Sequence, residues 1–142
     1  MSRTAETGLW KWLRDGRPSG CLLHRIENSV DSGTPDVIGT IYSQIFWMEL
    51  KVAESAGGKR LKLPHLTADQ ASFLRRWQAA GTPSSVLVQF GQGRAARRFL
   101  VPARWAHCML DEPFTFEWIE SVSLIEPDAN PEEVMHHAAF QA

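Results

Sequence analysis

The sequence predicts a single domain of the mixed α/β class, in which helices flank a mixed β-sheet. The chain has 142 residues, a length typical of one domain. Its hydrophobic fraction of 44% and charged fraction of 22% are those of a globular protein. The spacing of hydrophobic residues predicts a helix, three strands, a helix and two strands, in that order. Such an order is typical of strands and helices packed in layers within one domain.

The first half of the chain contains the first helix and three short strands. Residues 4–15 form an amphipathic helix that ends at Gly16, with apolar residues on one side at Leu9, Trp12 and Leu13. Strand patterns cover 21–28, 36–42 and 45–52, and Ser43-Gln44 is a tight turn between the last two. Residues 36–52 are therefore expected to form a hairpin.

The second half continues with a loop, a helix and two strands. Residues 53–62 read as a glycine-containing basic loop. A capping box, Thr67-Ala-Asp-Gln70, begins a helix that runs to Ala80. Strands follow at 85–90 and 97–101, whereas 103–110 and 116–125 are ambiguous. We expect the domain to span 1–126 and the polar segment 127–142 to be a peripheral acidic tail.

Charge is distributed unevenly along the chain. All 15 Lys and Arg residues precede position 111, and half of the 16 acidic residues lie within 111–142. A basic body with an acidic tail indicates a polyanionic ligand, although a solvated surface would have the same composition. No apolar run reaches a membrane span, the N-terminus has no signal-like apolar region, and two cysteines fit no disulfide scaffold. These features predict no membrane association and a reducing location, either the cytoplasm of a bacterial or phage-infected cell or another intracellular compartment.

The strand at 45–52 has an unusual polar face. Side chains alternate along a strand, so Phe46, Met48, Leu50 and Val52 face a core while Trp47, Glu49 and Lys51 face the other way. A buried carboxylate and ammonium are costly unless they are paired or bound to a metal. Asp36 begins the partner strand, and two carboxylates held together repel unless a divalent cation lies between them. Hard oxygen ligands of this kind suit Mg²⁺ or Mn²⁺.

The motif Pro35-Asp36, followed after twelve residues by Glu49-Leu50-Lys51, resembles the signature of the PD-(D/E)XK nuclease superfamily. The resemblance covers about residues 21–91 and extends to VRR-NUC-like and phage-type members, relatives of Holliday-junction resolvases. It rests on four segments: Arg25-Ile-Glu27-Asn, Ser32-Gly-Thr-Pro-Asp36-Val, Trp47-Met-Glu-Leu-Lys51-Val and Leu66-Thr-Ala-Asp-Gln70. It implies a restriction-endonuclease-like core with the order α-β-β-β-α-β.

The resemblance also implies a role for each motif residue. Asp36 and Glu49 match the metal ligands, with the Leu50 carbonyl as a third, and Lys51 matches the lysine that orients the attacking water. The expected cofactor is Mg²⁺, replaceable by Mn²⁺, with no organic cofactor. Bound to such a metal, water loses a proton near neutral pH. The alternative is that Glu49 and Lys51 form an exposed ion pair on an edge hairpin.

Two further polar residues each have more than one possible role. Glu27, at the end of the preceding strand, resembles an additional acidic ligand and is the residue that we expect to bind the metal. In some relatives that acid comes from the first helix, where Glu6 is the candidate, and an ordinary surface carboxylate is the third possibility. Gln70 resembles the polar residue that faces the site in the family, but its amide also fits the capping box.

Basic side chains fall where a nucleic-acid backbone could pass. Phosphate binding requires only positive charge and gives salt-dependent, largely sequence-independent affinity. For any one arginine a solvated face is the simpler interpretation, but as a set they predict a phosphate track. The set comprises Arg25, Lys59, Arg60, Lys62, Arg75, Arg76, Arg94, Arg97 and Arg98. Trp47 is expected in the core, with stacking on a base or sugar as the alternative.

The sequence thus predicts a Mg²⁺-dependent endonuclease that acts on DNA, with structured or branched DNA implied by the resolvase-like resemblance alone. The alternatives are a non-catalytic DNA-binding or assembly module on a nuclease fold, and a nuclease subunit of a larger phage or repair complex. Paired incision of a branched junction requires two sites, so we expect a homodimer. Aromatic residues of the terminal elements would form its interface unless they close the monomer's core: Trp10, Trp12, Trp105, Phe114, Phe116 and Trp118.

Overall fold

A five-stranded mixed sheet forms the centre of the computed structural model, which describes residues 2–27 and 33–141. The strand order is β1-β2-β3-β6-β7, in which β3 and β6 are parallel and every other pair is antiparallel. Strand β3 is therefore central, and the predicted mixed sheet is confirmed. The strands are β1 (Leu22–Arg25), β2 (Val37–Ile41), β3 (Gln44–Val52), β6 (Ser84–Phe90) and β7 (Arg97–Pro102).

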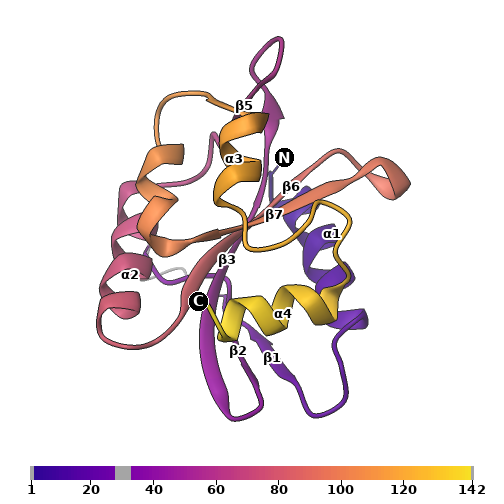
Figure 1. The fold of residues 1–142 in the computed structure, drawn as a ribbon, viewed down its shortest axis with the longest axis vertical. Coiled ribbons are helices and arrows are strands. Elements are labelled where there is room, and N and C mark those ends of the chain that lie inside the picture. The colour runs from indigo at the N-terminus through magenta and orange to yellow at the C-terminus, as the bar shows by residue number, and fades with distance from the viewer. Residues whose placement is uncertain (1, 28–32, 142) are drawn as a thin grey trace.

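Helices cover both faces of this sheet (Figure 1). Helices α1 (Ser2–Asp15) and α4 (Pro131–Ala139) pack on one face. The other face carries α2 (Ala68–Ala79), the 3₁₀ segment η2 (Ala103–Met109) and α3 (Phe116–Val122). A short 3₁₀ turn, η1 (Gly93–Ala95), joins β6 to β7. No helix in the described ranges is long and apolar enough to cross a membrane.

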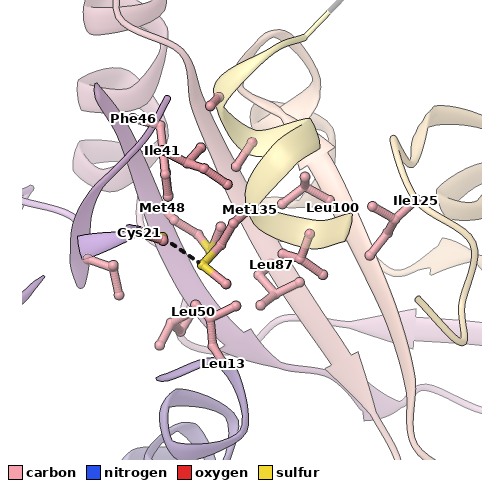
Figure 2. Packing of buried hydrophobic residues seen from close by; sticks show 14 of the residues in the cluster. Leu13, Cys21, Ile41, Phe46, Met48, Leu50, Leu87, Leu100, Ile125 and Met135 are labelled. Atoms are coloured by element: carbon pink, nitrogen blue, oxygen red, sulfur yellow. Dashed lines mark hydrogen bonds between the residues drawn. The ribbon is translucent and has the colours of Figure 1, made fainter. Parts of the chain in front are cut away.

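The alternation of side chains along β3 divides the molecule into two cores. Phe46, Met48 and Leu50 pack under α1 and α4, and Trp47 packs under α2. In the first core, shown in Figure 2, the Cys21 Sγ atom lies 3.3 Å from the Met135 Sδ atom. Because β3 is buried on both faces, its polar residues must be stabilised inside the protein.

The C-terminal segment belongs to the core, so the expectation of a peripheral tail at 127–142 is wrong. Asn130 and Glu133 form a capping box that begins α4, with Pro131 in its first turn. Four residues of the helix are buried against the sheet: Val134, Met135, Ala138 and Ala139. These four residues form only a short apolar stripe, and the rest of the helix consists largely of acidic residues and histidines. The segment is therefore polar on average, and its sequence does not reveal the buried side.

The segment expected to be a basic loop at 53–62 is a hairpin. Strands β4 (Glu54–Ser55) and β5 (Arg60–Lys62) pair with β8 (Phe114–Thr115) to form a second, three-stranded sheet. Leu61 and Phe114 are buried between this sheet and the second core. Pairing with a distant strand stabilises segments that are too short to carry a periodic pattern of their own.

The turn between β2 and β3 lies one residue earlier than predicted. Tyr42 and Ser43 occupy its centre with φ angles of 51° and 67°, and Gln44 already belongs to β3. Two consecutive residues at positive φ match the twist of a two-residue hairpin. The resulting register pairs Val37 with Met48, and it determines which residues lie beside the polar side chains of β3.

Candidate functional site

The β2–β3 register brings two carboxylates together. Asp36 immediately precedes β2, and the pairing of Val37 with Met48 places it across from Glu49. One Asp36 oxygen, Oδ2, accepts a hydrogen bond from the Leu50 N–H at 2.8 Å. Glu49 lies on the central strand and is only 1% exposed. The two acids therefore share one site at the junction of β2 and β3.

Lys51 is the third member of this cluster. Its Nζ atom lies 3.4 Å from Glu49 Oε2, and both side chains are buried. The same ammonium donates a hydrogen bond of 2.8 Å to the carbonyl of His65, in the segment between β5 and α2. This pair is therefore not the exposed ion pair on an edge hairpin that the sequence left open. The lysine is instead held in one position by two acceptors.

The electrostatics of the cluster favour a cation. Burial raises the pKa of Glu49 well above its usual value, Asp36 raises it further, and Lys51 only partly opposes the shift. The Oε1 atom of Glu49 is buried and has no hydrogen-bond partner among the described residues. An unpartnered buried carboxylate oxygen beside a second carboxylate is an unstable arrangement that a divalent cation would relieve.

The available donors fit Mg²⁺ or Mn²⁺. Among the described residues, no group of three His, Cys, Asp or Glu side chains lies close enough to hold a metal. The candidate donors are instead two neighbouring carboxylates, Asp36 and Glu49. Mg²⁺ commonly binds one or two carboxylates and keeps several waters, so this small oxygen set is sufficient.

Glu6 and Glu27, the two candidates for an additional acid, occupy different environments. Glu6, on α1, is half-buried, and burial raises its pKa; Lys51 and Arg25 lower it, and Asp36 raises it. Glu27 is exposed after the end of β1. The electrostatic neighbours of Glu6 are thus the residues of the cluster. Helix-to-sheet packing creates this proximity, and no spacing in the sequence reveals it.

Gln70 forms the predicted capping box. Its Oε1 atom accepts a hydrogen bond from the Thr67 N–H at 3.0 Å, and its own N–H donates to Thr67 Oγ1 at 3.2 Å. The side chain is half-buried at the first turn of α2. The capping role is therefore confirmed, and a role facing the site remains a prediction.

Trp47 lies in the second core and is not available for stacking on a base. Its ring contacts Phe73 and Trp77 edge-on, with centroid distances of 5.2 and 5.6 Å. Trp77 is the partly exposed ring of this group, at 40%. By helical spacing Trp77 lies on the same stripe of α2 as Phe73 and Leu74, but spacing alone does not show where a neighbouring element ends.

The predicted basic residues differ in their exposure to solvent and in their interactions with other side chains. Lys59, Arg60, Arg75, Arg76 and Arg94 are exposed, and Lys62 lies 4.0 Å from Glu54. By contrast, Arg97 forms an ion pair with Glu120 at 3.0 Å and lies over Phe116. Arg98 donates to Gln89 and stacks on Trp12, and burial lowers its pKa. Arg25 is half-buried at the end of β1, and its positive charge lowers the pKa of Glu6.

A shallow apolar groove of about 390 Å³ lies on the same sheet. Leu22, Thr40 and Ile45 are in register across three strands, on the face that also carries Trp47 and Glu49. Leu22 is 70% exposed and Ile45 is 50% exposed. This surface is not predictable from the sequence, because an apolar residue in a strand is expected to lie in the core.

Comparison with known proteins supports the fold. No family model matches this chain, and no curated protein matches it in sequence. A solved structure that does match is Hjc of Archaeoglobus fulgidus, described as a Holliday junction resolvase from an archaeal hyperthermophile. The TM-score is 0.54 at 19% sequence identity, and the alignment covers 95% of this chain and 98% of that chain. The two proteins share a fold over nearly their whole lengths, so this chain has the restriction-endonuclease-like fold that its sequence predicted.

Proposed function

We propose that this protein is a divalent-metal-dependent endonuclease of the PD-(D/E)XK superfamily that hydrolyses DNA phosphodiester bonds, with branched DNA as its substrate. The observation that carries the proposal is the pair Glu49 and Lys51, buried on the central strand β3, with the half-buried Asp36 beside them at the start of β2. The fold shared with a junction resolvase supports the branched substrate.

In this proposal, Asp36, Glu49 and the Leu50 carbonyl would hold Mg²⁺ or Mn²⁺. The metal would supply a water of lowered pKa and would neutralise the scissile phosphate. Lys51 would orient the attacking water and stabilise negative charge on the phosphate, with its ammonium positioned by the His65 carbonyl. Glu6 is a better-supported additional acid than Glu27, because the charges of Asp36 and Lys51 both act on the pKa of Glu6. Gln70 would border the site from α2.

The substrate backbone would contact exposed basic side chains around this cluster. Lys59, Arg60, Arg75 and Arg94 have charges open to solvent, whereas Arg97 and Arg98 are engaged inside the protein. We therefore assign phosphate binding first to the exposed group, with Arg25 and Lys62 contributing from partly paired positions. Recognition through backbone phosphates favours reading of DNA shape over sequence.

We also propose that the protein acts as a homodimer, because two symmetric strands of a branch require two sites. The expected interface changes, however. Of the terminal aromatic residues, Trp10, Trp12, Phe116 and Trp118 pack against the monomer's own cores, Phe114 is buried there, and Trp105 is 36% exposed. The exposed groove at Leu22 and Ile45 is the better surface. Light scattering should give twice the monomer mass for the wild-type protein. The double variant Leu22→Asp/Ile45→Asp should give the mass of a monomer.

The test of function is cleavage of plasmid, linear duplex and four-way-junction DNA in Mg²⁺ and in Mn²⁺. We expect cleavage by the wild-type protein, loss of it in Asp36→Asn, and full activity in the control Asp128→Asn, an exposed carboxylate far from β2 in sequence. Junction binding without cleavage in either metal would instead support the non-catalytic DNA-binding module. Activity only in the presence of additional phage or repair proteins would support a subunit of a larger complex.

A further inference from the structure

The β4–β5 hairpin, residues 54–62, forms an arm that stands away from the body of the molecule (Figure 1). At its turn, the Arg60 N–H donates to the Gly57 carbonyl at 3.2 Å. Gly57 and Gly58 have φ angles of +96° and +58°, which favour glycine. A Cβ atom built on either would meet nothing within 4 Å. The tip is therefore bare backbone open to solvent, which another molecule can approach closely.

The root of this arm is held firmly. Leu61 is fully buried, and β5 pairs with β8 through Leu61 and Phe114. The Phe116 N–H donates to the Lys59 carbonyl at 3.1 Å, which extends the attachment toward the tip. The arm is thus a fixed projection whose base packs into the second core.

Charge along the arm is graded from root to tip. At the root, Lys62 lies opposite Glu54, with 4.0 Å between Nζ and Oε1. Near the tip, Lys59 and Arg60 are exposed, and no carboxylate among the described residues lies within ion-pair distance of either. Two unpaired cations beside a bare glycine backbone suit the phosphates of a nucleic-acid backbone.

The arm is also tied to the candidate catalytic lysine. It leaves the sheet at the end of β3, just after Lys51, and the chain returns to hydrogen-bond the Lys51 ammonium through the His65 carbonyl at 2.8 Å. The tip at Gly58 is seven residues from Lys51, so it reaches at most roughly 23 Å from the lysine at about 3.3 Å per residue. That span corresponds to roughly seven base pairs of duplex at 3.4 Å each.

We propose that this arm is a second phosphate-binding point, which holds the substrate backbone within about seven base pairs of the scissile phosphate. The inference rests on the proposed function and goes beyond it, because it assigns a fixed, remote contact to one projecting element. The contacts are Lys59, Arg60 and the backbone of the glycine tip. The arm binds the sugar–phosphate backbone and reads no base.

The experiment compares Lys59→Ala/Arg60→Ala with the matched control Lys11→Ala/Arg104→Ala, which removes two exposed cations from α1 and η2. Binding to an end-labelled junction is measured in Ca²⁺ at several salt concentrations and mapped by hydroxyl-radical footprinting. The arm variant should bind roughly tenfold more weakly, and its log–log salt slope should fall by about two, one unit per lost phosphate contact. Its footprint should lose protection at positions away from the cut while keeping protection at the cut.

The control variant should match the wild-type protein in affinity, slope and footprint. If the arm variant behaves like the control while the wild-type protein binds and cuts DNA, the inference is overturned and the proposed function stands. If protection disappears equally at the cut and away from it, the arm is no separate contact and the inference is again overturned. If the wild-type protein binds and cuts no DNA at all, the proposed function itself fails.

Discussion

The two hairpins that flank Lys51 are built in opposite ways. The β2–β3 hairpin lies in the centre of the main sheet, is covered on both faces except near its turn, where Ile45 is exposed, and carries Asp36, Glu49 and Lys51 near its open end. The β4–β5 hairpin follows directly, with strands of two and three residues, a glycine tip and exposed cations. Burial on the first hairpin fixes the geometry of reactive groups, whereas exposure on the second presents charge at a distance.

The largest effect should come from the carboxylates of the first hairpin. Asp36→Asn and Glu49→Gln each remove one metal ligand with little change in volume. We expect the single-turnover cleavage rate in Mg²⁺ to fall on the order of 10⁴-fold or more. Junction binding in Ca²⁺, which depends on the exposed cations, should persist. Near wild-type rates in either variant would show that the site is assigned wrongly.

Lys51→Ala should have the next largest effect. Loss of a positioned group near the reacting phosphate is expected to slow single-turnover cleavage roughly 10²- to 10⁴-fold. Metal affinity, measured by titration calorimetry, should not decrease, because the lysine donates no metal ligand. An unchanged rate in Lys51→Ala would remove the lysine from the mechanism.

Matched truncations should distinguish the two hairpins in stability. Leu50 and Leu61 are both fully buried, the first on β3 and the second on β5. Leu50→Ala should lower the free energy of unfolding by about 4 kcal/mol and Leu61→Ala by about 2 kcal/mol, since the small sheet can relax around a cavity more than the central strand can. Urea denaturation measures both values. Equal losses would mean that the arm is as rigidly embedded as the main sheet.

The smallest effect should be a pH dependence of stability in the metal-free protein. Burial and Asp36 raise the pKa of Glu49 in the folded state, so the folded protein binds more protons than the unfolded chain above pH 4.5. The free energy of unfolding should therefore decrease as the pH rises from 4.5 toward the raised pKa of Glu49. Glu6 contributes in the same direction.

This dependence can be measured by urea denaturation in EDTA at pH 5 and pH 8. Glu49→Gln should show a smaller loss of stability between these two pH values than the wild-type protein, because glutamine does not titrate. An identical loss in both proteins would show that Glu49 ionises as it does in the unfolded chain.

The main sheet was predictable because its signals are local. The alternation at 44–52 and the capping box of Thr67 and Gln70 each specify an element from neighbouring residues alone. The clustering of Asp36 with Glu49 followed from the hairpin that these signals define. The proximity of the two carboxylates was therefore predictable because a short stretch of chain determines the geometry, while their role as metal ligands stays a prediction.

Features that depend on distant partners were not predictable from pattern. The β4–β5 hairpin is stabilised by pairing with β8, about 55 residues further along the chain. In α4, the buried residues alternate with polar ones, so the helix has no clear apolar pattern. The proximity of Glu6 to the cluster depends on how α1 lies on the sheet. The groove is exposed because no element in the described part of the chain covers Leu22 and Ile45. The sequence of a strand does not show which other elements pack on it.

The docking of α4 also has a consequence for the order of folding. Contacts such as that between Cys21 and Met135, 114 positions apart, close a very long loop of chain (Figure 2). Loop closure of this length is entropically costly, and folds rich in such contacts form slowly. We therefore expect the sheet to assemble first with one apolar face open to solvent, and helix α4 to seal that face in a late step.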